Sequence, residues 1–183
     1  MSDIRSLELR TVSVPGRFGA SLGDVGVVLS LVHPVSLVQV LARKGGAKVV
    51  EASLAKFQSV RVMRAGPGQF YVQSEGLADG LLAIELKRKL ESAASIVDQS
   101  HGRVVIRIFG EKARAVLAKG LPLDLHPDVF ALGQSAQSQM AHVGVHLTRT
   151  SQDEFEISVF RGFSESLWEW LCGAAAEYGF QVI

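Results

Sequence analysis

In the first half of the chain, hydrophobic runs typical of strands alternate with hydrophobic residues at the spacing of a helix. The run 35–41 is rich in β-branched residues and ends before a glycine pair, which is typical of a strand followed by a turn. Two β-rich runs, 60–63 and 69–72, flank the turn 65–68 and predict a hairpin. Apolar residues at helical spacing precede and follow this hairpin, at Ala47, Val50, Leu54 and Phe57 and at Leu82, Leu86, Leu90 and Ala93. This half therefore predicts the order β-α-β-β-α.

The second half predicts a similar succession of strands and helices. We expect strands at 95–98 and 103–108, forming a second hairpin, strands at 140–148 and 154–160, and helices at 111–119 and 164–179. Gly120 and Pro122 close the first of these helices, while Ser164 begins the second and Gly179 ends it. The apolar stripe of the last helix contains Leu167, Trp168, Leu171, Cys172, Ala175 and Tyr178.

The arrangement of these elements predicts an α+β fold. Residues 1 to about 34 contain several glycines and prolines, so we expect loops there with one short strand near Val25–Leu31. Helices that pack against mostly antiparallel strands, in two similar halves, define two ferredoxin-like lobes. We expect residues 1–183 to form a single bilobed domain with lobes at approximately 1–95 and 96–183.

Composition narrows the range of partners. Lys and Arg total 19 against 18 Asp and Glu, and the resulting net charge of +1 provides no field that would attract nucleic acid or an anionic membrane. The only cysteine, Cys172, excludes an intrachain disulfide and fits a reducing compartment, so we expect a cytoplasmic protein. The charged start of the chain, MSDIRSLELR, lacks the pattern of a secretory signal. A 48% hydrophobic composition without a membrane span suggests that another chain covers part of the surface.

The polar stretch 121–147 lacks the groups of a recognisable reaction centre. No Asp or Glu occurs between Asp128 and Asp153, so paired carboxylates for acid–base catalysis are missing. Asp124 and His126 are a candidate proton-transfer pair or part of a zinc site, but no third ligand or nucleophile is nearby in the sequence. Their turn-forming context favours a rigid, surface-presenting loop.

Other candidate motifs favour structural roles. Gly45-Gly46 and Gly66-Pro67-Gly68 lack the pattern of a phosphate-binding loop, so we interpret them as turns. His142 and His146 are four residues apart on an expected strand and share a face, but a metal needs a third ligand. Cys172 is expected to be a small buried hydrophobe. We therefore assign no catalytic, cofactor-binding or metal-binding residue to this chain.

A surface for another protein is the remaining prediction. The candidate interface residues are Leu125, His126, Phe130, Gln134, Gln137 and Trp170. Trp170 falls off the apolar stripe of the last helix, and an indole at such an edge is either a satellite of the core or an interface anchor.

Two passages resemble the gamma subunit of heterotetrameric sarcosine oxidase and its relatives among the N-methyl amino acid oxidases. The first comprises 97–103, Ile106, Gly110 and 113–120. The second, which is more specific, comprises 121–127, Phe130, Gly133, Ala136-Gln137 and 160–171, with the sequence FRGFSESLWEWL at its end. Together they cover most of residues 97–180.

The resemblance implies a non-catalytic subunit that helps to hold the large (alpha) subunit in a competent complex. That complex oxidatively demethylates sarcosine and passes the one-carbon unit to tetrahydrofolate, and FAD, FMN, NAD, tetrahydrofolate and zinc are implied to reside on the other subunits. The family is similar in turn to the first domain of folate-dependent aminomethyltransferases. Where those enzymes carry a carboxylate pair, the comparable segment 138–143 has none.

Two alternatives stay open. One is a stand-alone folate-dependent enzyme of the aminomethyltransferase type. The other is a gamma-type subunit of an oxidase or dehydrogenase for another N-methyl amino acid, such as N-methylglutamate. Substrate contacts would then belong to a different subunit, so the residues of this chain do not choose between the substrates.

Overall fold

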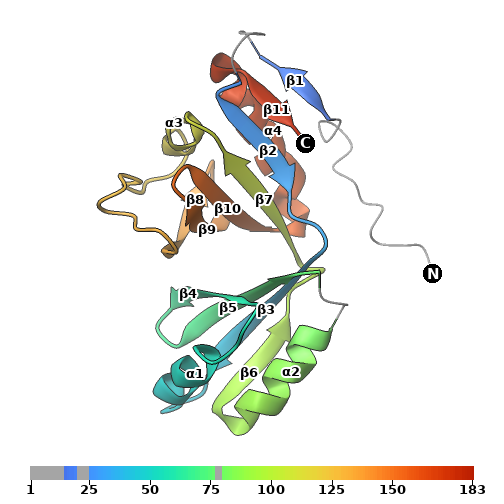
Figure 1. Ribbon diagram of the computed structural model, residues 1–183, viewed down its shortest axis with the longest axis vertical. Coiled ribbons are helices and arrows are strands. Elements are labelled where there is room, and N and C mark those ends of the chain that lie inside the picture. Colours follow the sequence, from blue (N-terminus) through green and yellow to red (C-terminus); the bar gives the residue numbers. More distant parts are fainter. Residues whose placement is uncertain (1–14, 20–24, 77–79) are drawn as a thin grey trace, which may run out of the picture.

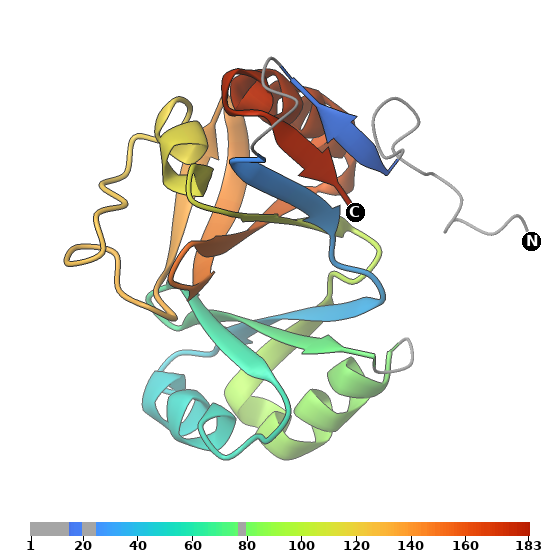
Figure 2. The same cartoon turned by 45° about the horizontal axis from the view of Figure 1, so that its top comes forward.

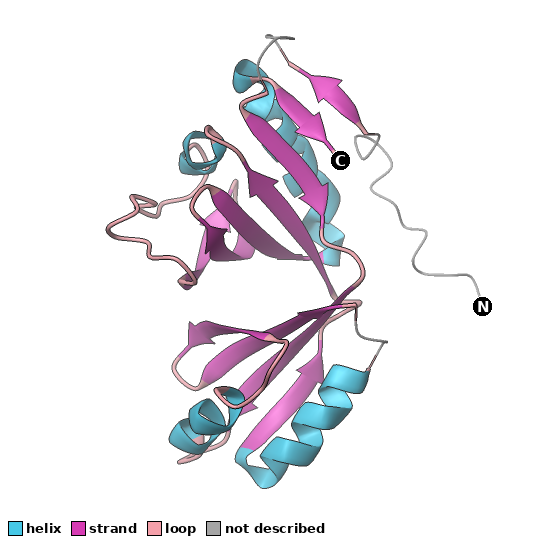
Figure 3. Cartoon of the chain, viewed as in Figure 1, coloured by secondary structure: helices cyan, strands magenta, loops and turns pink. Residues whose placement is uncertain are grey.

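Two β-sheets face each other in this protein. The computed structural model describes residues 15–19, 25–76 and 80–183, and in Figure 1 the larger sheet lies above the smaller one. Figure 3 shows few helices relative to strands, which confirms the expected α+β class. The charged segment 1–10, on which the expectation about a secretory signal rested, lies outside the described residues.

The smaller sheet has the ferredoxin-like arrangement. Its strands are β3 (Val35–Ala42), β4 (Arg61–Gly66), β5 (Gln69–Glu75) and β6 (Ala94–Asp98), and its helices are α1 (Ala47–Leu54) and α2 (Leu81–Leu90), the latter followed by the 3-10 turn η2 (Glu91–Ala93). The strand order is β4-β5-β3-β6, with every neighbouring pair antiparallel. Chain order β-α-β-β-α-β with this strand order matches the predicted lobe. Both helices lie on the side away from the larger sheet (Figure 2).

Local sequence explains why α2 forms where it does. Leu82, Leu86 and Leu90 are its buried residues, and their spacing places them on one face that packs into the same cluster as strand β3. The run 87–89 supplies three basic side chains to the last turn, where positive charge stabilises the negative end of the helix dipole. In the β4–β5 turn, Gly68 has φ +67, a conformation that glycine adopts at little cost.

The larger sheet contains a second ferredoxin-like unit and three further strands, one inside the unit and one at each edge of the sheet. Its strands are β1 (Gly16–Phe18), β2 (Val27–Leu31), β7 (Arg103–Phe109), β8 (Ser135–Met140), β9 (Val143–Ser151), β10 (Glu154–Phe160) and β11 (Phe180–Val182). Its helices are α3 (Ala113–Ala118) and α4 (Ser164–Ala175), with 3-10 turns η3 (Arg161–Phe163) and η4 (Ala176–Tyr178). The order is β1-β11-β2-β7-β10-β9-β8, so β2 lies between β7 and β11, antiparallel to the former and parallel to the latter.

One predicted strand pairing differs from the structure. The hairpin expected between 95–98 and 103–108 is wrong, because β6 pairs with β3 in the smaller sheet while β7 pairs with β2 and β10 in the larger. The turn between these strands therefore crosses from one sheet to the other. Strand β2 also joins the larger sheet, where Val27 and Leu29 are fully buried, so the division at residue 95 does not follow sheet membership.

The main core lies between the larger sheet and helices α3 and α4. It contains Trp168 and Cys172 from the predicted apolar stripe of α4, together with Leu29 and Ile106 from the sheet. All of the stripe is buried except Tyr178, which is partly buried. The helical face predicted from spacing is therefore confirmed, and it leaves the opposite face of the larger sheet to meet the smaller sheet.

Candidate functional site

The segment 121–134 forms a long loop between α3 and β8. It contains no helix or strand and projects from the side of the molecule (Figure 1). Leu121, Leu125 and Phe130 are buried in the main core, so three apolar anchors attach the loop to the body of the protein. A loop that is anchored in this way loses less freedom on binding than a mobile one does.

Hydrogen bonds within turns fix the backbone in the middle of this loop. Oδ1 of Asp124 accepts a hydrogen bond from the backbone N–H of His126 at 2.8 Å, as expected for an aspartate-stabilised turn. The carbonyl of His126 accepts bonds from the N–H groups of Val129 and Phe130, at 2.9 and 2.8 Å. The Asp124–His126 pair is thus part of the loop's backbone scaffold.

Arg149 on β9 clamps the loop from inside. Its side chain is buried, and Nη1 donates to the carbonyl of Phe130 at 2.7 Å and to that of Pro127 at 3.4 Å. Nε and Nη2 donate to the carbonyls of Ser151 and Gln152, each at 3.2 Å. The backbone of Arg149 also accepts from Gly133 N–H and donates to the carbonyl of Gln134. One buried arginine therefore connects the loop to the β9–β10 turn.

The structure separates the predicted interface residues into two groups. Leu125 and Phe130 point into the core, whereas His126, Gln134 and Gln137 are exposed. Their standing as interface residues stays a prediction, but the inward side chains contribute to the fold and do not form the outer surface of the loop.

Sequence reasoning missed two exposed aliphatic residues in the same loop. Val129 is 56% exposed and Leu132 is 66% exposed. A loop has no hydrophobic period, so nothing in the local pattern indicates that Phe130 is buried while its apolar neighbours are not. The signal that was available is the presence of two aliphatic residues among turn-forming ones.

Trp170 is half-buried at the contact between α4 and the end of α3. It packs against the main core, and a Cβ atom added to Gly120 would lie 2.5 Å from its Cη2 atom. The indole therefore covers the glycine that follows α3, and only a residue without a side chain fits beneath it. The indole thus packs against the core while it is partly exposed, and its role as an interface anchor stays a prediction.

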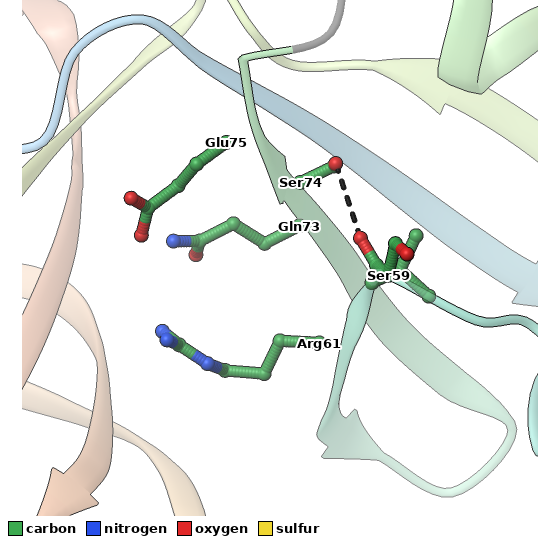
Figure 4. Close-up of a pocket in the computed structure, with 6 residues that line it drawn as sticks. Ser59, Arg61, Gln73, Ser74 and Glu75 are labelled. Atoms are coloured by element: carbon green, nitrogen blue, oxygen red, sulfur yellow. Dashed lines mark hydrogen bonds between the residues drawn. The ribbon is translucent and has the colours of Figure 1, made fainter.

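A second polar site lies between the two sheets. Glu156 on β10 is buried and accepts hydrogen bonds from Arg61 Nη1 at 2.5 Å and Gln73 Nε2 at 2.8 Å, both from the smaller sheet. Arg107 on β7 donates to the same carboxylate through Nε at 3.2 Å and Nη2 at 2.7 Å. In Figure 4, Arg61, Gln73 and Glu75 extend in one direction, away from their own strands. This network joins the layers and occupies both oxygens of Glu156.

The electrostatics of the layer follow from burial and pairing. Burial opposes the charge of Arg107, but the hydrogen bond and charge of Glu156, with Glu75 and Glu154, outweigh it and raise the pKa of Arg107. Burial lowers the pKa of His146, and its bond to the carbonyl of Arg64 at 3.1 Å only partly opposes this effect. The buried imidazole is therefore neutral at physiological pH and donates to that carbonyl.

Cys172, the candidate nucleophile, and His142 do not contribute to a recognisable reaction centre. Burial, followed by the charge of Glu169, raises the pKa of the Cys172 thiol to about 11. His142 lies in the β8–β9 turn with φ 68, so it does not share a strand face with His146 as expected. Among the residues that the structure describes, no group of three His, Cys, Asp or Glu side chains is placed to hold a metal ion. No described helix is long and apolar enough to cross a membrane.

The fold and the site together define a protein of two ferredoxin-like units whose buried Glu156 and His146 are hydrogen-bonded within its own structure. Comparison with known proteins identifies a family within this class. The chain belongs to the sarcosine oxidase, gamma subunit family, whose model matches residues 75–177.

Individual relatives agree with this assignment. The chain is 30% identical over 122 residues to sarcosine oxidase subunit gamma from Corynebacterium sp. (strain P-1), with 66% of this chain and 59% of that protein aligned. It is 28% identical over 124 residues to the subunit of the same name from Arthrobacter sp.. The aligned region thus spans about three-fifths of the length of these relatives.

Solved structures extend the similarity to the whole fold. A chain of heterotetrameric sarcosine oxidase from Corynebacterium sp. U-96, solved with pyrrole 2-carboxylate, matches with a TM-score of 0.76 and 25% identity over 88% of both chains. The glycine cleavage system aminomethyltransferase T from Bartonella henselae matches with a TM-score of 0.65 and 18% identity, over 87% of this chain and 48% of that one. The expected relation to the aminomethyltransferase fold is therefore confirmed.

Proposed function

We propose that this chain is a non-catalytic gamma subunit of a heterotetrameric sarcosine oxidase complex. The assembled enzyme would oxidatively demethylate sarcosine and pass the one-carbon unit to tetrahydrofolate. The observation that carries this proposal is the combination of the family match over 75–177 with a fold similar, over 88% of both chains, to a chain of heterotetrameric sarcosine oxidase.

The state of the buried ionisable groups supports a role without catalysis by this chain. Glu156 is occupied by donors from both sheets, His146 is neutral, and the Cys172 thiol has a pKa of about 11. A general acid or base needs a pKa near the working pH and access to substrate. These groups are buried in structural contacts and therefore lack that access.

In this proposal the other subunits bind the cofactors and carry out the catalysis. FAD, FMN, NAD, tetrahydrofolate and zinc would be held by the other subunits, and the large (alpha) subunit would be the main contact of this chain. The complex would act in the cytoplasm, which cell fractionation followed by detection of the subunit would test. What this chain contributes is a rigid surface, and the 121–134 loop is the part that is best suited to provide it.

Pre-organisation is the physical reason to choose this loop. Its anchors and the Arg149 clamp hold it in one conformation, so Val129 and Leu132 can be buried in a partner without the entropic cost of ordering a loop. His126 and Gln134 supply exposed polar groups at the edge of this apolar pair. An apolar centre with a polar rim is the usual composition of a binding surface.

A purified chain tests the absence of catalysis. Alone, it should show no hydrogen peroxide production from sarcosine and no flavin absorbance, while co-expression with the other subunits should yield a complex that oxidises sarcosine. Turnover by the isolated chain would contradict the proposal, as would micromolar folate affinity of the isolated chain, which would instead favour the aminomethyltransferase-like alternative. Preferential oxidation of N-methylglutamate by the complex would keep the subunit role and change the substrate.

A matched pair of double variants tests the surface. Val129→Ser with Leu132→Ser should weaken binding to the large subunit by about tenfold or more, because an apolar centre is lost. Leu81 and Ile84 on α2, which are 53% and 65% exposed, are almost equally exposed and provide the control when changed to serine. If the α2 variant abolishes binding and the loop variant does not, the interface is on α2 and the assignment to the loop is wrong.

A further inference from the structure

A pocket of about 430 Å³ opens beside the polar network between the sheets. Its lining residues come from the turn before β4, the first residue of β4 and the end of β5 (Figure 4), and they are Ser59, Val60, Arg61, Gln73, Ser74 and Glu75. This volume falls in the range of roughly 300–1,000 Å³ that is typical of small-molecule sites. The walls are mostly polar, so the groups that remain free for bonding decide which ligand fits.

Within this network both oxygens of Glu156 are occupied, and Arg107 uses its Nε and Nη2 groups for bonds to carboxylates. Both oxygens of Glu156 accept bonds from Arg61, Gln73 and Arg107. Nη2 of Arg107 is shared between Glu156 and Glu75, and its Nε donates to Glu156. These two residues hold the sheets together, and the pocket itself is lined by their partners Arg61, Gln73 and Glu75.

Arg61 and Glu75 both line the pocket and retain unused bonding groups. Arg61 is 37% exposed and uses Nη1 for Glu156, and within the described chain no acceptor contacts its Nε and Nη2 edge. Glu75 is 52% exposed and receives Arg107 on Oε1, while Oε2 has no donor among those same residues. The pocket therefore presents a guanidinium edge that fits a carboxylate and a carboxylate oxygen that fits an ammonium group.

The balance of charge determines the class of ligand. Two guanidinium groups, Arg61 and Arg107, face three carboxylates, Glu75, Glu154 and Glu156, so the cluster has one negative charge in excess. A simple anion would add to this excess, whereas a molecule with both charges can place its positive end on Glu75 and its negative end on Arg61. We propose that this pocket binds a small zwitterionic amino acid, with its carboxylate on Arg61 and its ammonium group on Glu75.

Three small probes separate the contributions of the two charges. The full-length chain, labelled for NMR, is titrated with glycine, with acetate, which has only the negative end, and with methylamine, which has only the positive end. Glycine should give saturable shifts of the amides of β4 and β5 with millimolar affinity. Acetate and methylamine should each bind at least about tenfold more weakly, because each loses one charge-assisted contact.

Variants identify the residues. Glu75→Gln removes the charge from a side chain that is half exposed, so the fold is kept, and it should weaken glycine binding at least about tenfold. Glu85→Gln, which removes an exposed carboxylate paired with Lys89 on α2, is the matched control and should leave binding unchanged. Arg61→Lys should also weaken binding, because lysine lacks the planar edge.

Three results would overturn the proposal. They are the absence of saturation by glycine at about 50 mM, well above a millimolar dissociation constant, equal affinity for acetate or methylamine, and unchanged glycine binding in Glu75→Gln. Because the titration uses the full chain alone, a negative result leaves the proposed subunit role untouched.

Discussion

Replacing Arg149 with methionine is predicted to loosen the 121–134 loop while both sheets stay folded. Methionine is long and apolar enough to occupy the buried site, but it donates no hydrogen bond. The carbonyls of Phe130 and Pro127 in the loop, and of Ser151 and Gln152 in the β9–β10 turn, would each lose a donor.

The size of the effect follows from burial and distance. The bond to Phe130 is the shortest, at 2.7 Å, and is buried, so the loss of its donor costs about 1–3 kcal/mol. The other three bonds measure 3.2 to 3.4 Å and are partly buried, so water replaces most of their contribution. We expect a total loss of about 2–3 kcal/mol, which corresponds to a decrease in Tm of roughly 4–12 °C for a chain of this length.

Thermal unfolding, which gives Tm, and amide hydrogen exchange, which gives protection of the loop, test this prediction. Protection of the Val129 and Phe130 amides should fall in Arg149→Met, and affinity for the large subunit should fall about tenfold, since the loop must be reordered on binding. Arg88→Met on the exposed side of α2 is the matched control and should change neither quantity. Unchanged Tm and loop protection in Arg149→Met would refute the clamp.

Three further predictions concern the core. Gly120→Ala should cost about 1–3 kcal/mol, because the new methyl group would lie 2.5 Å from Trp170 Cη2, and the smaller side chain of Trp170→Leu should recover part of this loss in urea unfolding of the double variant. Because burial lowers the pKa of His146, the unfolded chain binds the proton more readily, so the free energy of unfolding should fall below pH about 6.5 by up to about 1.4 kcal/mol per pH unit until the folded pKa is reached. His146→Gln should flatten this dependence between pH 7.5 and 5.5. The Cys172 thiol, with a pKa of about 11, should react with a disulfide reagent at pH 8 only after unfolding; rapid labelling of the native chain would show that the thiol is accessible.

Local periodicity determined much of the secondary structure. The leucine spacing of α2, the apolar stripe of α4 and the glycine turn between β4 and β5 were all readable, because each depends on residues that are near one another in sequence. The sequence also carried the family resemblance over 97–180, and the order of elements in the first half was sufficient to predict a ferredoxin-like unit. The secondary-structure elements among these features are encoded by residues that lie close together in the sequence.

Tertiary structure alone decided how the two units are joined. The polar turn between β6 and β7 fits a hairpin as well as a crossover, and the strands that pair with β6 and β7 lie far from this turn in the sequence. In the same way, packing decided that Phe130 is buried while Val129 and Leu132 are exposed. Glu156 shows the reason most clearly: its donors lie 49, 83 and 95 residues away along the chain, so no local pattern encodes a site that exists only when both sheets are in place.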